Sequence, residues 1–135
     1  MKGLIYLASP YTHKNKIQRD VSYLQALRTC HVFNECGIPI FSPIVYGHQF
    51  AVNCGAPLGY EYWKPLDSSM QQVCTELLIL QIDGWKVSSG ISEEITEFEI
   101  QDKKIGYINM LEVAQFENGK ISKIRANPYP QITGD

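Results

Sequence analysis

Ser88, Gly90 and Glu94 have the spacing Ser-x-Gly-x-x-x-Glu, and they follow an apolar segment, residues 76–81, of the kind found in buried strands. A Ser-x-Gly turn ahead of a helix offers backbone amides and a hydroxyl group to an anion such as phosphate. A carboxylate held beside a helix N-terminus can act as a nucleophile or a base. The same residues also fit a helix end without chemistry, with Ser88 as N-cap and Glu94 as a solvated acid of the first turn. Spacing alone leaves both interpretations open.

Other polar residues are equally ambiguous when each is taken alone. Asp67 has the same ambiguity as Ser88, because it could simply cap the helix that follows it. His48 lies in a long segment where a histidine is more often a surface or packing residue than a ligand. Tyr6 lies inside an apolar strand and would by default belong to the core. His13 and His31 have no partner at metal-ligand spacing, so no metal site is expected.

Composition restricts the class of protein that these residues can serve. The 135 residues suit one domain over 1–135, and the hydrophobic fraction of 44% is that of an ordinary soluble globular protein. A net charge of −2 without any basic run argues against a nucleic-acid polymer as partner. The N-terminal apolar run is too short for a signal peptide or a membrane span. Four cysteines without Cys-x-x-Cys spacing predict reduced thiols and a cytoplasmic location.

The apolar pattern predicts the elements that position these side chains. Strands are expected at residues 3–8, 38–41, 76–81 and 104–110, with helices over about 13–36 and 94–103. In the first helix, helical spacing relates Ile17, Val21, Leu24, Leu27 and Val32. Apolar strands that alternate with helices predict an α/β fold, a flavodoxin/Rossmann-like parallel sheet of four to five strands flanked by helices.

Two segments have less regular patterns. Residues 44–63 are rich in glycine and aromatic side chains without a sustained period, which predicts a long functional loop, and Asp67 then caps a short helix through Cys74. Residues from about 111 form a C-terminal extension. Asn118-Gly119 predicts a hairpin that pairs residues 112–117 with residues 120–125, and a helix over 111–116 is the alternative.

In open parallel sheets, ligands bind beyond the carboxyl ends of the strands. Three segments of this chain are expected to meet there: residues 9–13, 42–63 and 83–90. Nearly every unusual polar or aromatic residue lies in or beside one of them. The sequence therefore predicts where a site would lie, whatever its chemistry.

Taken together, these segments resemble the nucleoside 2-deoxyribosyltransferase-like superfamily, which includes small nucleotide N-glycosidases. Within it, the chain is most similar to a branch of short bacterial and phage proteins. The shared pattern comprises "IYLASPYTH", "FSPIVYGH", "W...D..M" and "LLIL...GW..SSG...E". It runs through most of the chain up to about Met110.

The resemblance implies specific roles. It makes Glu94 the nucleophile at the anomeric carbon of the sugar and Asp67 the group that assists at the base or orients the sugar. Tyr6 would position the nucleophile, and Ser88 would contact a 5′-phosphate. The further residues implied in substrate binding are Ser9, Pro10, Tyr11, His48, Trp63 and Gly90.

The implied reaction is cleavage of the N-glycosidic bond of a nucleoside or nucleoside 5′-monophosphate. Water as acceptor gives a hydrolase and a second base gives a transferase, and neither requires a metal or cofactor. The resemblance also implies a homo-oligomer. Nucleotide-cleaving members carry a Gly/Arg-rich first loop that helps to hold phosphate, whereas this chain has "ASPYTHK". The residues that could supply the missing positive charge are His13, Lys14 and Arg19. The alternatives are a non-catalytic nucleotide-binding module on the same fold, and a structural protein whose capping residues imitate the motif.

Overall fold

Four parallel strands form a sheet in the computed structural model of the protein, which describes residues 3–11 and 15–119. They are β1 (Ile5–Ala8), β2 (Ile40–Phe41), β3 (Glu76–Leu80) and β4 (Lys104–Ile108), in the order β2-β1-β3-β4. β1 pairs with both β2 and β3, with Tyr6 opposite Phe41 on one side and Leu77 on the other. The predicted α/β fold with a parallel sheet is confirmed.

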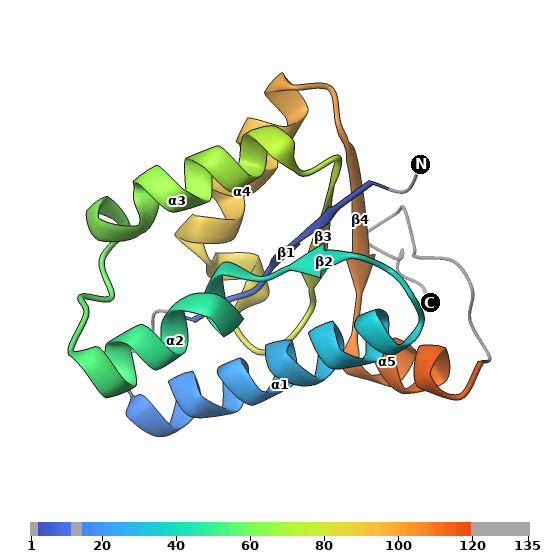
Figure 1. Cartoon of the computed structure of the whole chain (residues 1–135), viewed down its shortest axis with the longest axis horizontal. Helices are drawn as coiled ribbons and strands as arrows, with labels where there is room; N and C mark the ends of the chain where they lie inside the picture. Colours follow the sequence, from blue (N-terminus) through green and yellow to red (C-terminus); the bar gives the residue numbers. More distant parts are fainter. Residues whose placement is uncertain (1–2, 12–14, 120–135) are drawn as a thin grey trace.

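Helices cover both faces of this sheet, as Figure 1 shows. The helices on one face are α1 (Lys16–Glu35) and α5 (Met110–Glu117), and those on the other are α3 (Tyr60–Val73) and α4 (Ser89–Ile100). Side chains along β1 alternate between the two layers: Leu7 packs toward α1 and α5, whereas Tyr6 packs toward α4. Burial on both faces explains why the strands read as continuous apolar runs.

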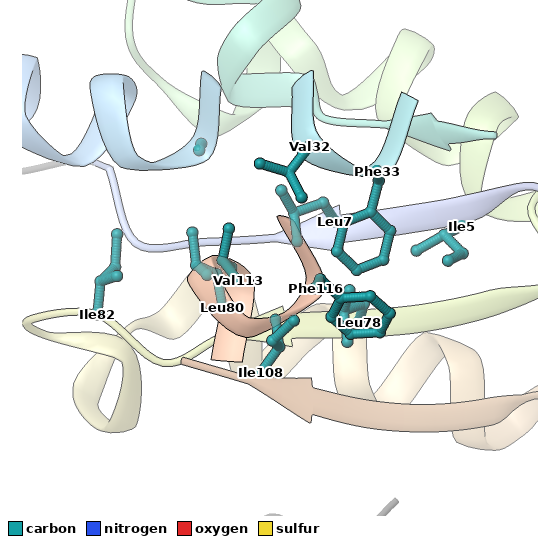
Figure 2. Packing of buried hydrophobic residues seen from close by; sticks show 11 residues of the cluster. Ile5, Leu7, Val32, Phe33, Leu78, Leu80, Ile82, Ile108, Val113 and Phe116 are labelled. Atoms are coloured by element: carbon teal, nitrogen blue, oxygen red, sulfur yellow. The ribbon is translucent and has the colours of Figure 1, made fainter. Parts of the chain in front are cut away.

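The layer between the sheet, α1 and α5 is a closely packed apolar core (Figure 2). Phe33 of α1 and Phe116 of α5 lie with ring centroids 5.1 Å apart, and Val113 is fully buried beside them. Burying a side chain of this size contributes roughly 1.5–3 kcal/mol. The segment that follows Met110 therefore begins as part of the core.

The first helix forms as predicted but buries a different face. Its residues Ile17 and Leu24 are 73% and 57% exposed, whereas Ser22, Ala26 and Thr29 are buried. Small residues let a helix approach the sheet closely, and the Thr29 hydroxyl is satisfied by the carbonyl of Gln25 at 2.8 Å. Of the spaced apolar residues, Val32 alone is buried. The helix begins after the N-cap Asn15, and the predicted start at His13 lies outside the described residues.

The predicted long loop is wrong, because residues 43–54 and 60–73 are helical. α2 (Pro43–Cys54) begins after Ser42, whose hydroxyl accepts from the Val45 amide at 3.1 Å, and Pro43 occupies the first helical position. Gly55 ends α2 in the left-handed region with φ 69°. Asp67 lies inside α3 and does not cap a helix. The aromatic residues obscured helices whose end signals were present.

The predicted hairpin is also wrong, because residues 111–116 are helical. Asn109 accepts from the Glu112 amide at 2.9 Å, and the Glu112 carboxylate accepts from the Asn109 amide at 2.9 Å. This reciprocal capping box starts α5 and outweighs the Asn-Gly turn signal. The expected partner strand, residues 120–125, lies outside the described residues.

Candidate active site

A pocket of about 870 Å³ opens at the carboxyl ends of β1 and β3. The chain connections reverse direction between these two strands, which is where open α/β sheets bind ligands. The loop after β1, the turn after β3 and the helices α2, α3 and α4 all contribute to its wall. The expected site residues that line it are Ser9, Pro10, Tyr11, His48, Trp63, Asp67, Ser88, Gly90 and Glu94. The structure therefore brings nine of the sequence-predicted residues together.

Tyr6 lies behind this wall, fully buried, and contacts the pocket through Glu94. Its hydroxyl donates a hydrogen bond of 2.9 Å to Glu94 Oε2 and accepts one of 3.2 Å from Gln71 Nε2. Three elements, β1, α3 and α4, thus meet at one phenolic oxygen. Because an ionised carboxylate can only accept, the Tyr6 proton points to Glu94.

Glu94 lies in the second turn of α4, so its interpretation as a first-turn acid is wrong. Burial raises the pKa of this carboxyl group to about 8. The hydrogen bond from Tyr6 opposes that shift, while the charges of Asp67 and Glu93 add to it. Burial also raises the pKa of Asp67, to about 6. Two carboxyl groups with perturbed pKa values in one pocket are a frequent feature of catalytic sites.

Asp67 presents an unsatisfied acceptor. Its Oδ1 atom is buried and has no hydrogen-bond partner among the residues that the structure describes. Ser9 Oγ, at the end of β1, is buried and unpartnered within the same residues. A buried polar atom without a partner costs free energy. Both atoms are therefore candidates to bond with a ligand.

Ser88 has the capping role that its sequence position allows. Its hydroxyl oxygen accepts from the Ile91 amide at 3.2 Å and starts α4. The residue also lines the pocket, so capping and ligand contact are compatible. Space does not require a glycine at position 90, because an added Cβ would lie 3.7 Å from Ser88 Oγ, an ordinary contact.

A second cluster of polar side chains lies where α1, α2 and the loop after β1 form the pocket. The Tyr11 hydroxyl and His48 Nδ1 are 2.7 Å apart, and Tyr23 stacks on the imidazole with ring centroids 3.9 Å apart. Asp20 Oδ1 lies 3.8 Å from His48 Nε2. Burial lowers the pKa of His48, whereas the Asp20 carboxylate opposes this shift. His48 is thus part of a fixed polar cluster, not a free surface residue.

Trp63 forms an aromatic wall with α2. Its indole Nε1 donates to the Pro57 carbonyl at 2.8 Å, and its ring lies edge-on to Phe50 with centroids 5.7 Å apart. Gly47 permits this packing, because a Cβ there would lie 2.9 Å from the indole ring. The wall gives the pocket an apolar side suited to a flat ligand.

Sequence reasoning missed Gln71, Asp20 and Tyr23. A signal for Gln71 existed, because Trp63, Asp67 and Gln71 are spaced by four residues and share one face of α3. The loop prediction concealed that spacing. For Asp20 and Tyr23, sequence gives no comparable signal, since their contact with His48 depends on how α1 packs against α2.

Across residues 3–11 and 15–119, no group of three or more histidine, cysteine, aspartate or glutamate side chains has the arrangement of a metal site. Among those residues, none of the helices has the length and apolar character needed to cross a membrane.

Comparison with known proteins gives one family match. No curated protein matches the chain. A family model described as a domain of unknown function, DUF1937, matches residues 3–110. The match covers all four strands and the whole pocket wall, and it ends at the first residue of α5. The chain therefore belongs to the DUF1937 family.

Proposed function

We propose that the protein cleaves the N-glycosidic bond of a (2-deoxy)nucleoside or nucleoside 5′-monophosphate, with Glu94 as nucleophile. The observation that carries this proposal is the pair of carboxyl groups, on α3 and α4, in a single pocket where Tyr6 fixes one of them. Cleavage of a C1′–N bond develops positive charge on the sugar and negative charge on the base. A carboxylate stabilises the positive charge on the sugar, and a proton donor neutralises the negative charge on the base.

Near neutral pH the carboxyl pair holds about one proton, and in the free protein that proton resides mainly on Glu94 because its pKa is the higher. When a sugar with developing positive charge lies beside Glu94, the carboxylate form is favoured there. The proton then passes to Asp67 and on to the leaving base. Glu94 attacks C1′, the electrons of the C1′–N bond go to the base, and a glycosyl ester remains.

The ester is released by an acceptor. Attack of water at C1′, with one water proton passing to the Asp67 carboxylate, breaks the ester bond, regenerates the Glu94 carboxylate and frees the sugar. Attack by a second base, which gives its N–H proton to Asp67, forms a new nucleoside. Trp63 gives a flat base an aromatic surface, and the Tyr11–His48 pair offers hydrogen-bonding groups to its edge. These steps use only side chains of the chain, its substrate and the acceptor.

Incubation with a panel of nucleosides and their 5′-monophosphates, with free base detected by chromatography, tests the proposal. Glu94→Gln should lower base release by orders of magnitude, because the amide keeps the shape but cannot attack C1′. Glu99→Gln is the matched control, since Glu99 lies on the same helix, is exposed and does not line the pocket. Base release by the Glu94→Gln protein at the wild-type rate would show that Glu94 is not the nucleophile.

The alternative is a module that binds a nucleoside or nucleotide without turnover. The raised pKa of Glu94 favours it, because a protonated carboxyl group can donate a hydrogen bond to a ligand but attacks poorly. Calorimetry that shows saturable binding, together with no free base over long incubation, would favour this alternative over the enzyme.

We also propose that the chain forms a homo-oligomer in the cytoplasm. The exposed apolar side chains on the outer face of α1, Ile17, Val21 and Leu24, support the first part, because covering them with a second copy removes apolar surface from water. The second part is supported by four cysteines with free thiols, as expected in a reducing compartment.

A further inference from the structure

We infer that the pocket prefers an uncharged nucleoside to the corresponding 5′-monophosphate. This inference rests on the proposed function and settles which of its two substrate classes the site fits. It begins from the charges around the pocket. The lining acids are Asp67, Asp83, Glu93, Glu94 and Glu97, whereas Lys64 is the one cation among the lining residues that the structure describes.

The acids are concentrated where a phosphate would be expected. Glu93, Glu94 and Glu97 all lie on α4, the helix whose N-terminus would have to receive the anion. Their charges act over this distance, since Glu93 contributes to the raised pKa of the Glu94 carboxyl group. A phosphate dianion would add like charge to this cluster, and the half-charge of a helix N-terminus is too small to offset two or three carboxylates.

The helix N-terminus is also partly occupied. The Ile91 amide, which is one of the free donors of the first turn, already donates to the Ser88 hydroxyl. An anion at this end would have to share or displace that cap. Ser88, to which the resemblance assigns the phosphate contact, thus already has a structural partner in this chain.

Lys64 and Lys16 have other contacts, and Arg19 acts on the charges of the Tyr11–His48 cluster without lining the pocket. Lys64 Nζ lies 5.6 Å from the centre of the ring of Tyr60, another lining residue, and Lys64 is exposed to solvent. Lys16 Nζ bonds Asp20 Oδ2 at 2.8 Å, so its charge is compensated beside the Tyr11–His48 cluster. Recognition of phosphate in proteins usually relies on Arg or Lys side chains directed at its oxygens. None of the described lining residues is an arginine.

An uncharged nucleoside fits the same groups well. Carboxylates accept hydrogen bonds, and the sugar hydroxyls are donors. The sugar hydroxyls can therefore donate to the carboxylates of Glu93 and Glu97 and to the unpartnered Asp67 Oδ1. The same negative charges would repel a phosphate. The geometry favours a ligand that carries several hydroxyl groups and no negative charge.

The test compares the four common 2′-deoxynucleosides with their 5′-monophosphates, at constant ionic strength. Base release gives kcat/KM, and calorimetry on the same wild-type protein gives Kd. We expect kcat/KM and affinity to favour the nucleoside by about tenfold or more, as a single uncompensated charge contact would produce. The double variant Glu93→Gln/Glu97→Gln should reduce the preference for the nucleoside, because both kcat/KM and affinity for the monophosphate should rise. Glu99→Gln, on the same helix but outside the pocket, should leave it unchanged.

Failure of this inference and failure of the proposed function are separable. Base release that is equal or faster with the monophosphate overturns the inference and leaves the proposed function standing. If neither ligand releases base, the proposed function fails, and the binding measurement alone decides the preference. Tighter binding of the nucleoside then supports the inference, whereas equal or tighter binding of the monophosphate, or no saturable binding of either, overturns it.

Discussion

The Tyr6 hydroxyl donates a 2.9 Å hydrogen bond to Glu94 Oε2 and so connects the centre of the sheet to a carboxyl group in the pocket. Burial of Glu94 favours its protonated form, and this hydrogen bond is the contact that favours the carboxylate. The Tyr6 phenol itself stays protonated, because burial and the neighbouring carboxylates raise its own pKa. Tyr6 is therefore a fixed donor that sets the pH range in which Glu94 can be ionised.

Tyr6→Phe should move the ionisation of Glu94 to higher pH. Without the hydrogen bond, burial acts unopposed and the pKa of the carboxyl group rises further above about 8. Because the one proton that the carboxyl pair holds is then lost at higher pH, the high-pH limb of the profile of kcat/KM for base release should shift upward. Gln71 also loses its acceptor, which should lower the free energy of unfolding by about 1–3 kcal/mol.

Tyr107→Phe is the control for this variant, since Tyr107 is buried in the same layer of the core, on β4, which β3 separates from β1. It should leave the pH profile in place. A Tyr6→Phe protein with an unshifted limb would show that another group controls the profile.

Glu94→Gln should stabilise the protein increasingly as pH rises. The folded-state pKa of Glu94, about 8, lies above its ordinary value of 4.5, so the folded protein binds the proton more tightly than the unfolded chain. That contribution is complete below about pH 4.5 and is lost as pH rises through 8. Because a glutamine has no charge to desolvate, the variant avoids the loss.

Thermal unfolding of both proteins from pH 5 to pH 9 measures this effect. The difference should be small at pH 5 and exceed about 1 kcal/mol at pH 9, since one pKa unit corresponds to roughly 1.4 kcal/mol. A difference that does not change with pH would mean that Glu94 ionises with an ordinary pKa.

The fold could be predicted because each strand is recognisable from its own residues alone. Strands buried on both faces appear as short apolar runs, and residues 76–80 need no distant information to be recognised. The Ser88–Glu94 part of the site is equally local. Gln71 became visible only in the fold, because its role depends on Tyr6, which lies 65 positions earlier in the chain.

The errors have physical causes of the same kind. Apolar spacing in α1 identified a helix but not its buried face, because the sheet accepts the small residues Ser22 and Ala26 there. In α2, the sequence pattern predicts a loop at Gly47, although this residue contacts the Trp63 ring within a helix. Neither assignment can be made before the packing partner is known.

Gly47→Ala should disturb the aromatic wall of the pocket. Its Cβ would lie 2.9 Å from the Trp63 ring, so the indole must shift, and overpacking of this kind costs typically about 1–3 kcal/mol. The expected result is a lower melting temperature and an altered tryptophan fluorescence spectrum. Gly59→Ala is the control, because no atom lies within 4 Å of a Cβ there. Unchanged fluorescence and stability in Gly47→Ala would show that the ring has room.

Leu24→Glu should dissociate the proposed oligomer without unfolding the chain. Leu24 is 57% exposed on the outer face of α1, so a charge there is tolerated in a monomer but not in a buried contact. Size-exclusion chromatography with light scattering should show a smaller mass for the variant. Ile100→Glu, at the exposed end of α4, should keep the wild-type mass. A monomeric wild-type protein would contradict the oligomer itself.

Asn109→Ala should weaken α5 and, through it, the core. The Asn109 side chain accepts from the Glu112 amide, and its loss also frees the Glu112 carboxylate from the reciprocal bond. Removal of an N-cap costs about 0.5–2 kcal/mol, which chemical denaturation can measure. Base release should change little, because Asn109 does not line the pocket.

Asn118→Ala is the control that distinguishes a helix over residues 111–116 from a hairpin. Asn118 follows the last residue of α5, so the helical arrangement predicts a smaller effect there than at Asn109. A hairpin around Asn118-Gly119 would reverse the order, because the turn would depend on Asn118 and Asn109 would cap nothing. Greater damage from Asn118→Ala than from Asn109→Ala would therefore contradict the helical assignment of residues 111–116 in solution.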